Sequence, residues 1–170
     1  MKRIYLAGPT VFFGNRAQVF EQLKALCTKH NVLGVSPLDG EATSGIPTSA
    51  EINLANIQKI HDCDGVLADL RPFRGKYEPD SGTCFELGYA CALGKPGAMY
   101  LPKSAQSLKD KIGQFSGYTE KDGELVDNEF QMSVEDFGNP LNLMLSENYK
   151  SFDTAEEALI HLIQCISETD

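Results

Sequence analysis

Short apolar runs alternate with helical patterns along this chain, and that alternation limits the fold more than any other feature. Apolar runs bounded by turn residues predict strands at residues 3–8, 31–37, 65–70 and 96–101. Apolar residues at helical spacing predict helices at residues 15–29, 49–62, 83–93 and 154–166, with a further helix at 104–115. Strands that alternate with helices indicate βαβ units and a parallel sheet. We therefore predict an α/β fold, a Rossmann/flavodoxin-like parallel sheet of about five strands flanked by helices.

No linker or internal repeat divides the sequence, so residues 1–170 are expected to form a single domain. Residues 38–48 are rich in turn-forming residues and predict a long loop. Residues 116–132 are polar and poorly periodic, which predicts a loop or an insertion. The helix at residues 49–62 is expected to bury Ile52, Ala55, Ile57 and Ile60.

Acidic residues outnumber basic ones, with 24 Asp and Glu against 15 Lys and Arg and a net charge of -9. Such a field repels polyanions, so nucleic acids and anionic membranes are poor partners, whereas a neutral small molecule is not disfavoured. No apolar run is long enough to cross a bilayer, and the first residues lack a signal-peptide pattern. We expect a cytoplasmic protein.

The cysteines and histidines do not suggest a metal or a disulfide framework. The five cysteines form no C-x-x-C pair, and the three histidines lie far apart in the sequence. Cys84 and Cys91 fit small core positions better than nucleophilic ones. We therefore expect no metal and no cofactor.

Glu86 is the only charged residue between Cys84 and Leu93, near the start of a predicted helix. A carboxylate on a buried helix is costly unless something compensates, and the positive end of the helix dipole offers compensation. A shielded but ionised carboxylate suits a nucleophile. The alternative is a first-turn glutamate that only stabilises the helix end.

Two further carboxylates, those of Asp80 and Asp69, are candidates for the same site. Asp80 lies six residues upstream, either as the helix N-cap or as a proton donor whose pKa is separated from that of Glu86. Such a pair is typical of glycosidic bond cleavage. Asp69 ends the third predicted strand, at the edge where parallel sheets bind ligands, although aspartate is also an ordinary loop residue there.

The first loop runs from Gly8 through Phe12 and Phe13. Pro9 removes a backbone donor and the aromatic residues add apolar bulk, so the loop fits an aromatic base better than a phosphate. One of the two phenylalanines is also expected to be a core residue.

Four blocks resemble the nucleoside 2-deoxyribosyltransferase family. These are the residues from Ile4 to Pro9, from Asp62 to Leu70, from Pro79 to Ala90, and from Pro140 to Leu145. The block around Glu86 is the most specific. The resemblance implies a ping-pong exchange in which a glutamate attacks C1′ of a 2′-deoxynucleoside, the base leaves, and a second base takes the deoxyribose.

The resemblance also implies residue roles. Glu86 matches the nucleophile, Asp80 an aspartate near the leaving base, and Tyr5 a tyrosine whose hydroxyl orients the nucleophile. Asn142 matches an asparagine that a neighbouring subunit lends to the sugar 5′-hydroxyl, with Met144 beside it, which implies a homo-oligomer with shared sites.

At two positions this chain departs from the residues that some members carry. Asn56 stands where some members place a base-contacting aspartate, and Glu41 where some have a glutamine. Two rival functions are a hydrolase of 2′-deoxynucleoside 5′-monophosphates, which would need a phosphate-binding first loop, and a nucleotide sensor, which would not need Glu86.

Overall fold

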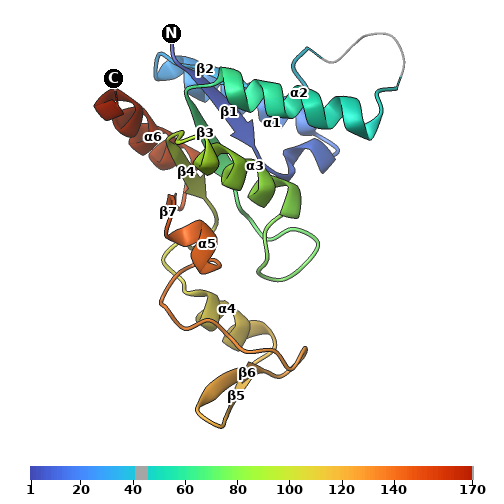
Figure 1. Cartoon of the computed structure of the whole chain (residues 1–170), viewed down its shortest axis with the longest axis vertical. Coiled ribbons are helices and arrows are strands. Elements are labelled where there is room, and N and C mark those ends of the chain that lie inside the picture. The colour runs from blue at the N-terminus through green and yellow to red at the C-terminus, as the bar shows by residue number, and fades with distance from the viewer. Residues whose placement is uncertain (41–45, 170) are drawn as a thin grey trace.

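The structure is a computed structural model that describes residues 1–40 and 46–169, and within these residues a five-stranded sheet forms the centre (Figure 1). All pairings in this sheet are parallel, in the order β2-β1-β3-β4-β7. The strands are β1 (Arg3–Ala7), β2 (Leu33–Val35), β3 (Gly65–Asp69), β4 (Gly97–Tyr100) and β7 (Lys150–Phe152). The predicted fold class is confirmed.

Helices cover both faces of the sheet, because β1, β3 and β4 are buried almost throughout and need an apolar neighbour on each side. The helices are α1 (Arg16–Lys29), α2 (Ser49–Asp62), α3 (Ser81–Ala92) and α6 (Ala155–Thr169). In Figure 1, α2 and α3 lie on the face nearest the viewer, and α1 and α6 on the other. Tyr5 belongs to the core cluster of the first face, with Ile60 and Leu87.

α2 begins with a capping box that the sequence reasoning missed. The Thr48 side chain accepts a hydrogen bond from the Glu51 backbone N–H, and the Glu51 carboxylate accepts one from the Thr48 backbone N–H. The expected buried face of this helix is largely wrong. Ile60 is fully buried, whereas Ile52 and Ala55 are exposed and Ile57 is half-buried.

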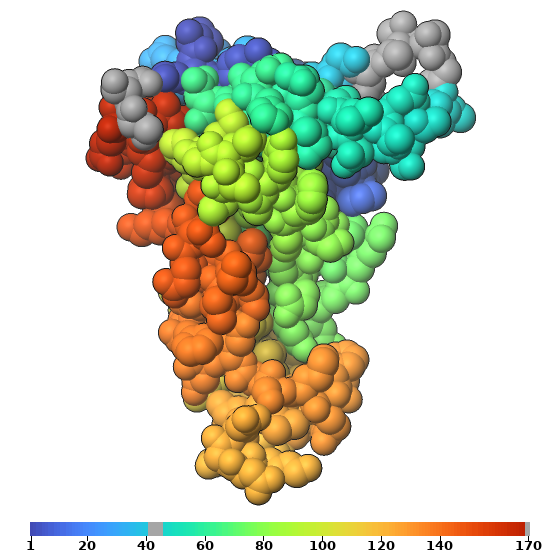
Figure 2. All heavy atoms as spheres, viewed as in Figure 1, coloured from blue at the N-terminus to red at the C-terminus, as the bar shows by residue number. Residues whose placement is uncertain are grey.

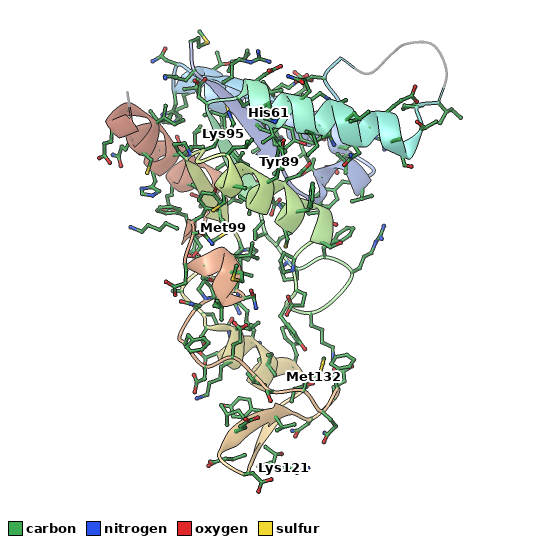
Figure 3. The ribbon with its side chains drawn as sticks, viewed as in Figure 1. His61, Tyr89, Lys95, Met99, Lys121 and Met132 are labelled. Carbon is green, nitrogen blue, oxygen red and sulfur yellow. The ribbon has the colours of Figure 1, made fainter. Side chains whose placement is uncertain are left out.

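Polar contacts join α2 to α3 at their ends, as Figure 3 shows for His61, Tyr89 and Lys95. The Tyr89 hydroxyl lies 2.5 Å from His61 Nε2, and the two rings meet edge to face. Lys95 Nζ donates to the carbonyl oxygens of His61 and Cys63, which end α2. These contacts join the C-terminal ends of the two helices, both of which contact β1.

The segment between β4 and β7 extends away from the sheet as an arm (Figures 1 and 2). It contains α4 (Leu108–Phe115), the antiparallel pair β5 (Tyr118–Lys121) and β6 (Glu124–Asp127), and α5 (Leu143–Ser146). Lys121 marks the tip of this hairpin in Figure 3. Residues 116–132 were predicted as a loop or an insertion, and the two strands within them were missed. The Asp122-Gly123 turn, in which both residues have positive φ, closes the hairpin.

Among the residues that the structure describes, none of the helices is both long and apolar enough to span a membrane.

Candidate active site

The Tyr5 hydroxyl donates a hydrogen bond of 2.6 Å to Glu86 Oε1, and this contact defines the site. Tyr5 lies in the middle of β1, and its side chain is fully buried toward α2 and α3. Glu86 lies in the second turn of α3, on the side that faces the sheet. No residue within the described ranges hydrogen bonds to the other carboxylate oxygen, Oε2. The carboxylate therefore has one fixed oxygen and one available for chemistry.

The surroundings of Glu86 raise its pKa to about 7, chiefly because burial disfavours the charged form. The hydrogen bond from Tyr5 acts in the opposite direction, since it stabilises the carboxylate. The negative charge of Asp80 raises the pKa further, and the positive charge of Lys59 lowers it. Glu86 can therefore exist as a partly desolvated anion near neutral pH, as a nucleophile or a general base requires.

Asp80 is the N-cap of α3. Its Oδ2 accepts hydrogen bonds from the backbone N–H of Thr83 at 2.9 Å and from the Thr83 hydroxyl at 2.8 Å. The capping alternative considered for this residue is therefore present. Its Oδ1 has no hydrogen-bond partner among the described residues. The cap fixes the carboxyl group one turn and a half before Glu86, close enough for their charges to interact.

Gly8 follows β1 where the chain passes close to the end of β3. A Cβ atom at this position would lie 2.8 Å from the Cβ of Asp69, and its φ of 152° is one that side chains rarely adopt. The close approach brings the first loop against the carboxyl end of the neighbouring strand. Because β1 and β3 flank the point where the strand order reverses, this is the expected ligand position in such sheets.

Asp69 is buried, with 1% of its surface exposed, and its carboxylate is bound within the chain. Arg71 Nε donates to Oδ2 at 2.7 Å and the Arg71 backbone N–H donates to Oδ1 at 3.1 Å. Burial raises the pKa of Asp69, and the charge of Arg71 opposes that rise. The arrangement fixes Arg71 above the first loop, where its guanidinium lies 5.3 Å from the centre of the Phe13 ring.

Phe12 ends the short helix η1 (Pro9–Phe12) and is 56% exposed. Its ring stacks on Phe73 at 5.1 Å, and the Arg74 guanidinium lies over both rings. Phe13 is half-buried, so the expectation that one of the two phenylalanines is a core residue is wrong. The phenylalanines instead form an aromatic and cationic layer with the loop before α3. The sequence reasoning missed Phe73.

α2 contributes Asn56 and Lys59, one turn apart on its inner side. Asn56 Oδ1 is buried, and no hydrogen-bond partner for it lies in the described part of the chain. Such an acceptor is costly unless a ligand or water satisfies it. Lys59 Nζ donates to the Pro37 carbonyl oxygen, and its charge reaches Glu86. Lys59 comes one turn after Asn56 and next to the buried Ile60, and this spacing indicates a place on the inner side of the helix. The sequence reasoning did not use that signal. The predicted site residue Glu41 lies outside the described residues.

Asn142 and Met144 do not line the space beside Tyr5 and Glu86 in their own chain. Both lie at α5, where they border a pocket on the far side of α3 with Ser81, Cys84 and Cys91. Cys84 and Cys91 are half-buried there and are not the core residues that were expected. Met144 is 68% exposed and Asn142 is exposed as well. The chain itself therefore brings together Tyr5, Asp80 and Glu86, but not the residues of α5.

A sequence model of the nucleoside 2-deoxyribosyltransferase family matches residues 4–144. The chain belongs to the nucleoside 2-deoxyribosyltransferase family. The matched range includes every predicted site residue from Tyr5 to Met144. The family resemblance that the four sequence blocks indicated is confirmed.

Solved structures share the fold of this chain. A 2-desoxiribosyltransferase from Leishmania mexicana is 36% identical with a TM-score of 0.76, and the alignment covers 96% of this chain and 98% of that one. A conserved protein from Enterococcus faecalis (24% identity, TM-score 0.60, covering 97% and 99% of the two chains) shares the fold. So does a 2-deoxyribosyltransferase from Bacillus psychrosaccharolyticus (16%, 0.57, covering 91% and 88%).

A curated relative is an uncharacterised protein of Schizosaccharomyces pombe, which is 38% identical over 118 residues. These residues are 62% of this chain, and they span 56% of the length of that relative.

Proposed function

We propose that this protein transfers 2-deoxyribose between nucleobases by cleaving the N-glycosidic bond of 2′-deoxynucleosides. Family membership supports a deoxyribosyltransferase type of activity. The observation that carries the proposal is the 2.6 Å hydrogen bond between the Tyr5 hydroxyl and Glu86 Oε1, which leaves Oε2 for attack.

In the proposed first step, Glu86 Oε2 forms a bond to C1′ while the bond from C1′ to the base nitrogen breaks. The electron pair of the broken bond leaves with the base, which takes up a proton, and the deoxyribose remains as an ester on Glu86. In the second step, the nitrogen of another base attacks C1′, loses its proton and releases the carboxylate. We assign Asp80 as the carboxyl group that exchanges this proton, because the family resemblance implies an aspartate near the leaving base at this position and the helix cap occupies only its Oδ2 among the described residues.

The remaining site residues are proposed to bind substrate. Gly8 and Phe12 provide the floor and an exposed ring for the base, and Asp69 fixes Arg71 beside them. The unpartnered Asn56 Oδ1 suits an N–H donor on the base. Glu41 remains a predicted contact. Asn142 and Met144 are proposed to complete the site of a neighbouring subunit in a homo-oligomer, since both are exposed and lie away from Glu86.

Base exchange tests this function directly. The pure protein is incubated with thymidine and adenine, and deoxyadenosine is followed by chromatography. Deoxyadenosine formation is the expected result, and deoxyinosine with adenine serves as a second pair in case only purines are accepted. Failure of both pairs, with no release of free base, would contradict the proposal.

The rate should depend on pH in the neutral range. The pKa of Glu86 is about 7, and only the carboxylate attacks, so kcat/KM is expected to rise as the pH passes through about 7. In Tyr5→Phe the hydrogen bond that stabilises the carboxylate is lost, so the pKa of Glu86 rises. The rising limb should then move upward by roughly one pH unit.

Initial rates of wild type and of Tyr5→Phe between pH 5 and pH 9 locate the rising limb of each pH profile. Tyr118→Phe is a suitable control, because that tyrosine lies on the arm hairpin. If the rising limb of Tyr5→Phe lies at the same pH as that of wild type, the Tyr5 hydroxyl does not set the ionisation of the nucleophile.

A further inference from the structure

Asn142 is exposed, yet its side-chain amide is held in one orientation. Its Oδ1 accepts a hydrogen bond of 3.0 Å from the backbone N–H of Met144. Its Nδ2 donates to Glu135 Oε1. Fixing an exposed side chain costs conformational entropy, which these two contacts must offset. The first contact is an ordinary helix cap, but capping alone does not require the second.

Glu135 is well placed to hold the amide because it is itself fixed. Its second oxygen, Oε2, accepts a hydrogen bond of 3.0 Å from the backbone N–H of Leu143. The neighbouring chain is anchored by Leu141, which is buried in the core, and by Lys111, whose Nζ donates to the Pro140 carbonyl at 2.7 Å. A carboxylate at position 135 therefore determines which way the Asn142 amide faces.

An asparagine amide can donate two hydrogen bonds and accept two. Glu135 and Met144 use one of each. Within the part of the chain that the structure describes, the second N–H and the second lone pair of Asn142 have no partner. The amide thus presents one donor and one acceptor. A hydroxyl group can both donate and accept a hydrogen bond, so it can pair with both.

We propose that Glu135 is a positioning residue that holds the Asn142 amide toward the 5′-hydroxyl of a nucleoside bound in a neighbouring subunit, and that its charge selects against a 5′-phosphate. This inference rests on the proposed function and on the shared site. It adds Glu135, a residue for which the family resemblance implied no role.

The charges around Glu135 support the second half of the proposal. Glu78, Asp127 and Glu135 line one hollow of about 320 Å³ together with Asn142. The negative charge of Glu135 acts on Glu78, whereas Lys111 acts on Glu78 with the opposite sign. The charge of Lys76 acts on Asp127, so three carboxylates stand against two ammonium groups and leave the hollow negative. A dianionic phosphate on the 5′ oxygen would be repelled, but a neutral hydroxyl would not.

The test compares three donors with one acceptor base: a 2′-deoxynucleoside, its 2′,5′-dideoxy analogue and its 5′-monophosphate. Glu135→Ala removes the contact to Asn142, and Glu135→Gln removes the charge while keeping an acceptor. Glu147→Gln is the matched control, because Glu147 is an exposed carboxylate of the same segment that binds the Asn139 amide at 3.1 Å.

For Glu135→Ala we expect kcat/KM to fall roughly tenfold with the 2′-deoxynucleoside and to stay within about twofold with the 2′,5′-dideoxy donor. For Glu135→Gln we expect the ratio of monophosphate to nucleoside turnover to rise roughly tenfold. Glu147→Gln should change neither quantity, and Asn142→Ala should reproduce the first effect. Thermal unfolding of each variant verifies that it folds.

Equal losses with both donors in Glu135→Ala would indicate a merely structural role and overturn the inference. Glu135 variants with the same kinetics as wild type would also overturn the inference. The inference would fail as well if the wild-type enzyme exchanged bases equally well with the 5′-hydroxyl and the 5′-deoxy donors. Each of these results leaves the transferase function in place. A wild-type protein that exchanges no base with any donor would instead refute the proposed function, and this inference with it.

Discussion

Glu86→Gln is expected to abolish base exchange and at the same time to stabilise the protein at alkaline pH. The amide cannot form the bond to C1′, so kcat should fall by at least about 10³-fold, as found when nucleophiles are removed from other enzymes. Glutamine keeps the shape of the side chain, and its carbonyl can still accept the Tyr5 hydrogen bond. The loss would therefore report chemistry rather than misfolding.

The gain in stability follows from the raised pKa of Glu86, from 4.5 to about 7. A carboxyl group whose pKa is higher in the folded state is fully stabilising below its unfolded pKa and loses that contribution as the pH rises through its folded pKa. Near pH 8 the wild type thus bears a desolvated charge. The glutamine variant avoids it, and should be more stable there by on the order of 2 kcal/mol.

Thermal unfolding at pH 5 and pH 8 measures this difference, and chromatography measures the exchange. Near pH 5 the two proteins should melt within a few degrees of each other. Glu21→Gln is a suitable control, because Glu21 is an exposed residue of α1. Retained exchange in Glu86→Gln would place the nucleophile elsewhere. A variant less stable than wild type at pH 8 would show that the Glu86 charge is well compensated.

Gly8→Ala is expected to destabilise the fold by about 3 kcal/mol, since it combines a clash with an unfavourable backbone conformation. The new methyl group would lie 2.8 Å from the Cβ of Asp69, on the neighbouring strand. Neither atom belongs to a flexible side-chain end, so the first loop or the end of β3 must move. Such a shift also displaces Arg71, which Asp69 fixes over Phe13.

For a chain of this size, the melting temperature should fall by roughly 6–12 °C. Gly14→Ala is the matched control, because a Cβ at Gly14 would meet no atom within 4 Å and its φ is not in the unfavourable range. That variant should melt close to wild type. If Gly8→Ala melts like Gly14→Ala, the strands can separate at this point without cost and the close approach is not essential.

The sheet was predictable from sequence because its central strands are continuous apolar runs with turn residues after them. β7 was not among the predicted segments, since its three residues, Lys150–Phe152, are too few to show a period. The β5–β6 hairpin was missed despite its Asp122-Gly123 turn. β5 is mostly exposed, and in β6 only Glu124 is exposed, so neither strand has the alternation of buried and exposed residues that usually reveals a strand.

The centre of the site was predictable for a similar reason. A lone carboxylate in an apolar helix start, such as Glu86, stands out in a sequence. The contacts that position it depend on chain crossings that spacing does not encode. Tyr5 and Glu86 are 81 residues apart, and only the packing of α3 on β1 brings them to 2.6 Å. The pairing of Glu135 with Asn142 likewise needed coordinates, because both residues are ordinary for an exposed segment.

The arm has its own two-stranded sheet, which is not joined to the five-stranded sheet. Small units of this kind open locally at a lower free energy than the rest of a protein. Backbone amides of β5 and β6 should therefore exchange with deuterated water much faster than those of β1 and β3, which are buried. Because Asn142 lies in this arm, between β6 and α5, each such opening would loosen the group proposed for a neighbour's substrate. The frequency of these openings would then set a lifetime for the shared site that is shorter than the lifetime of the fold.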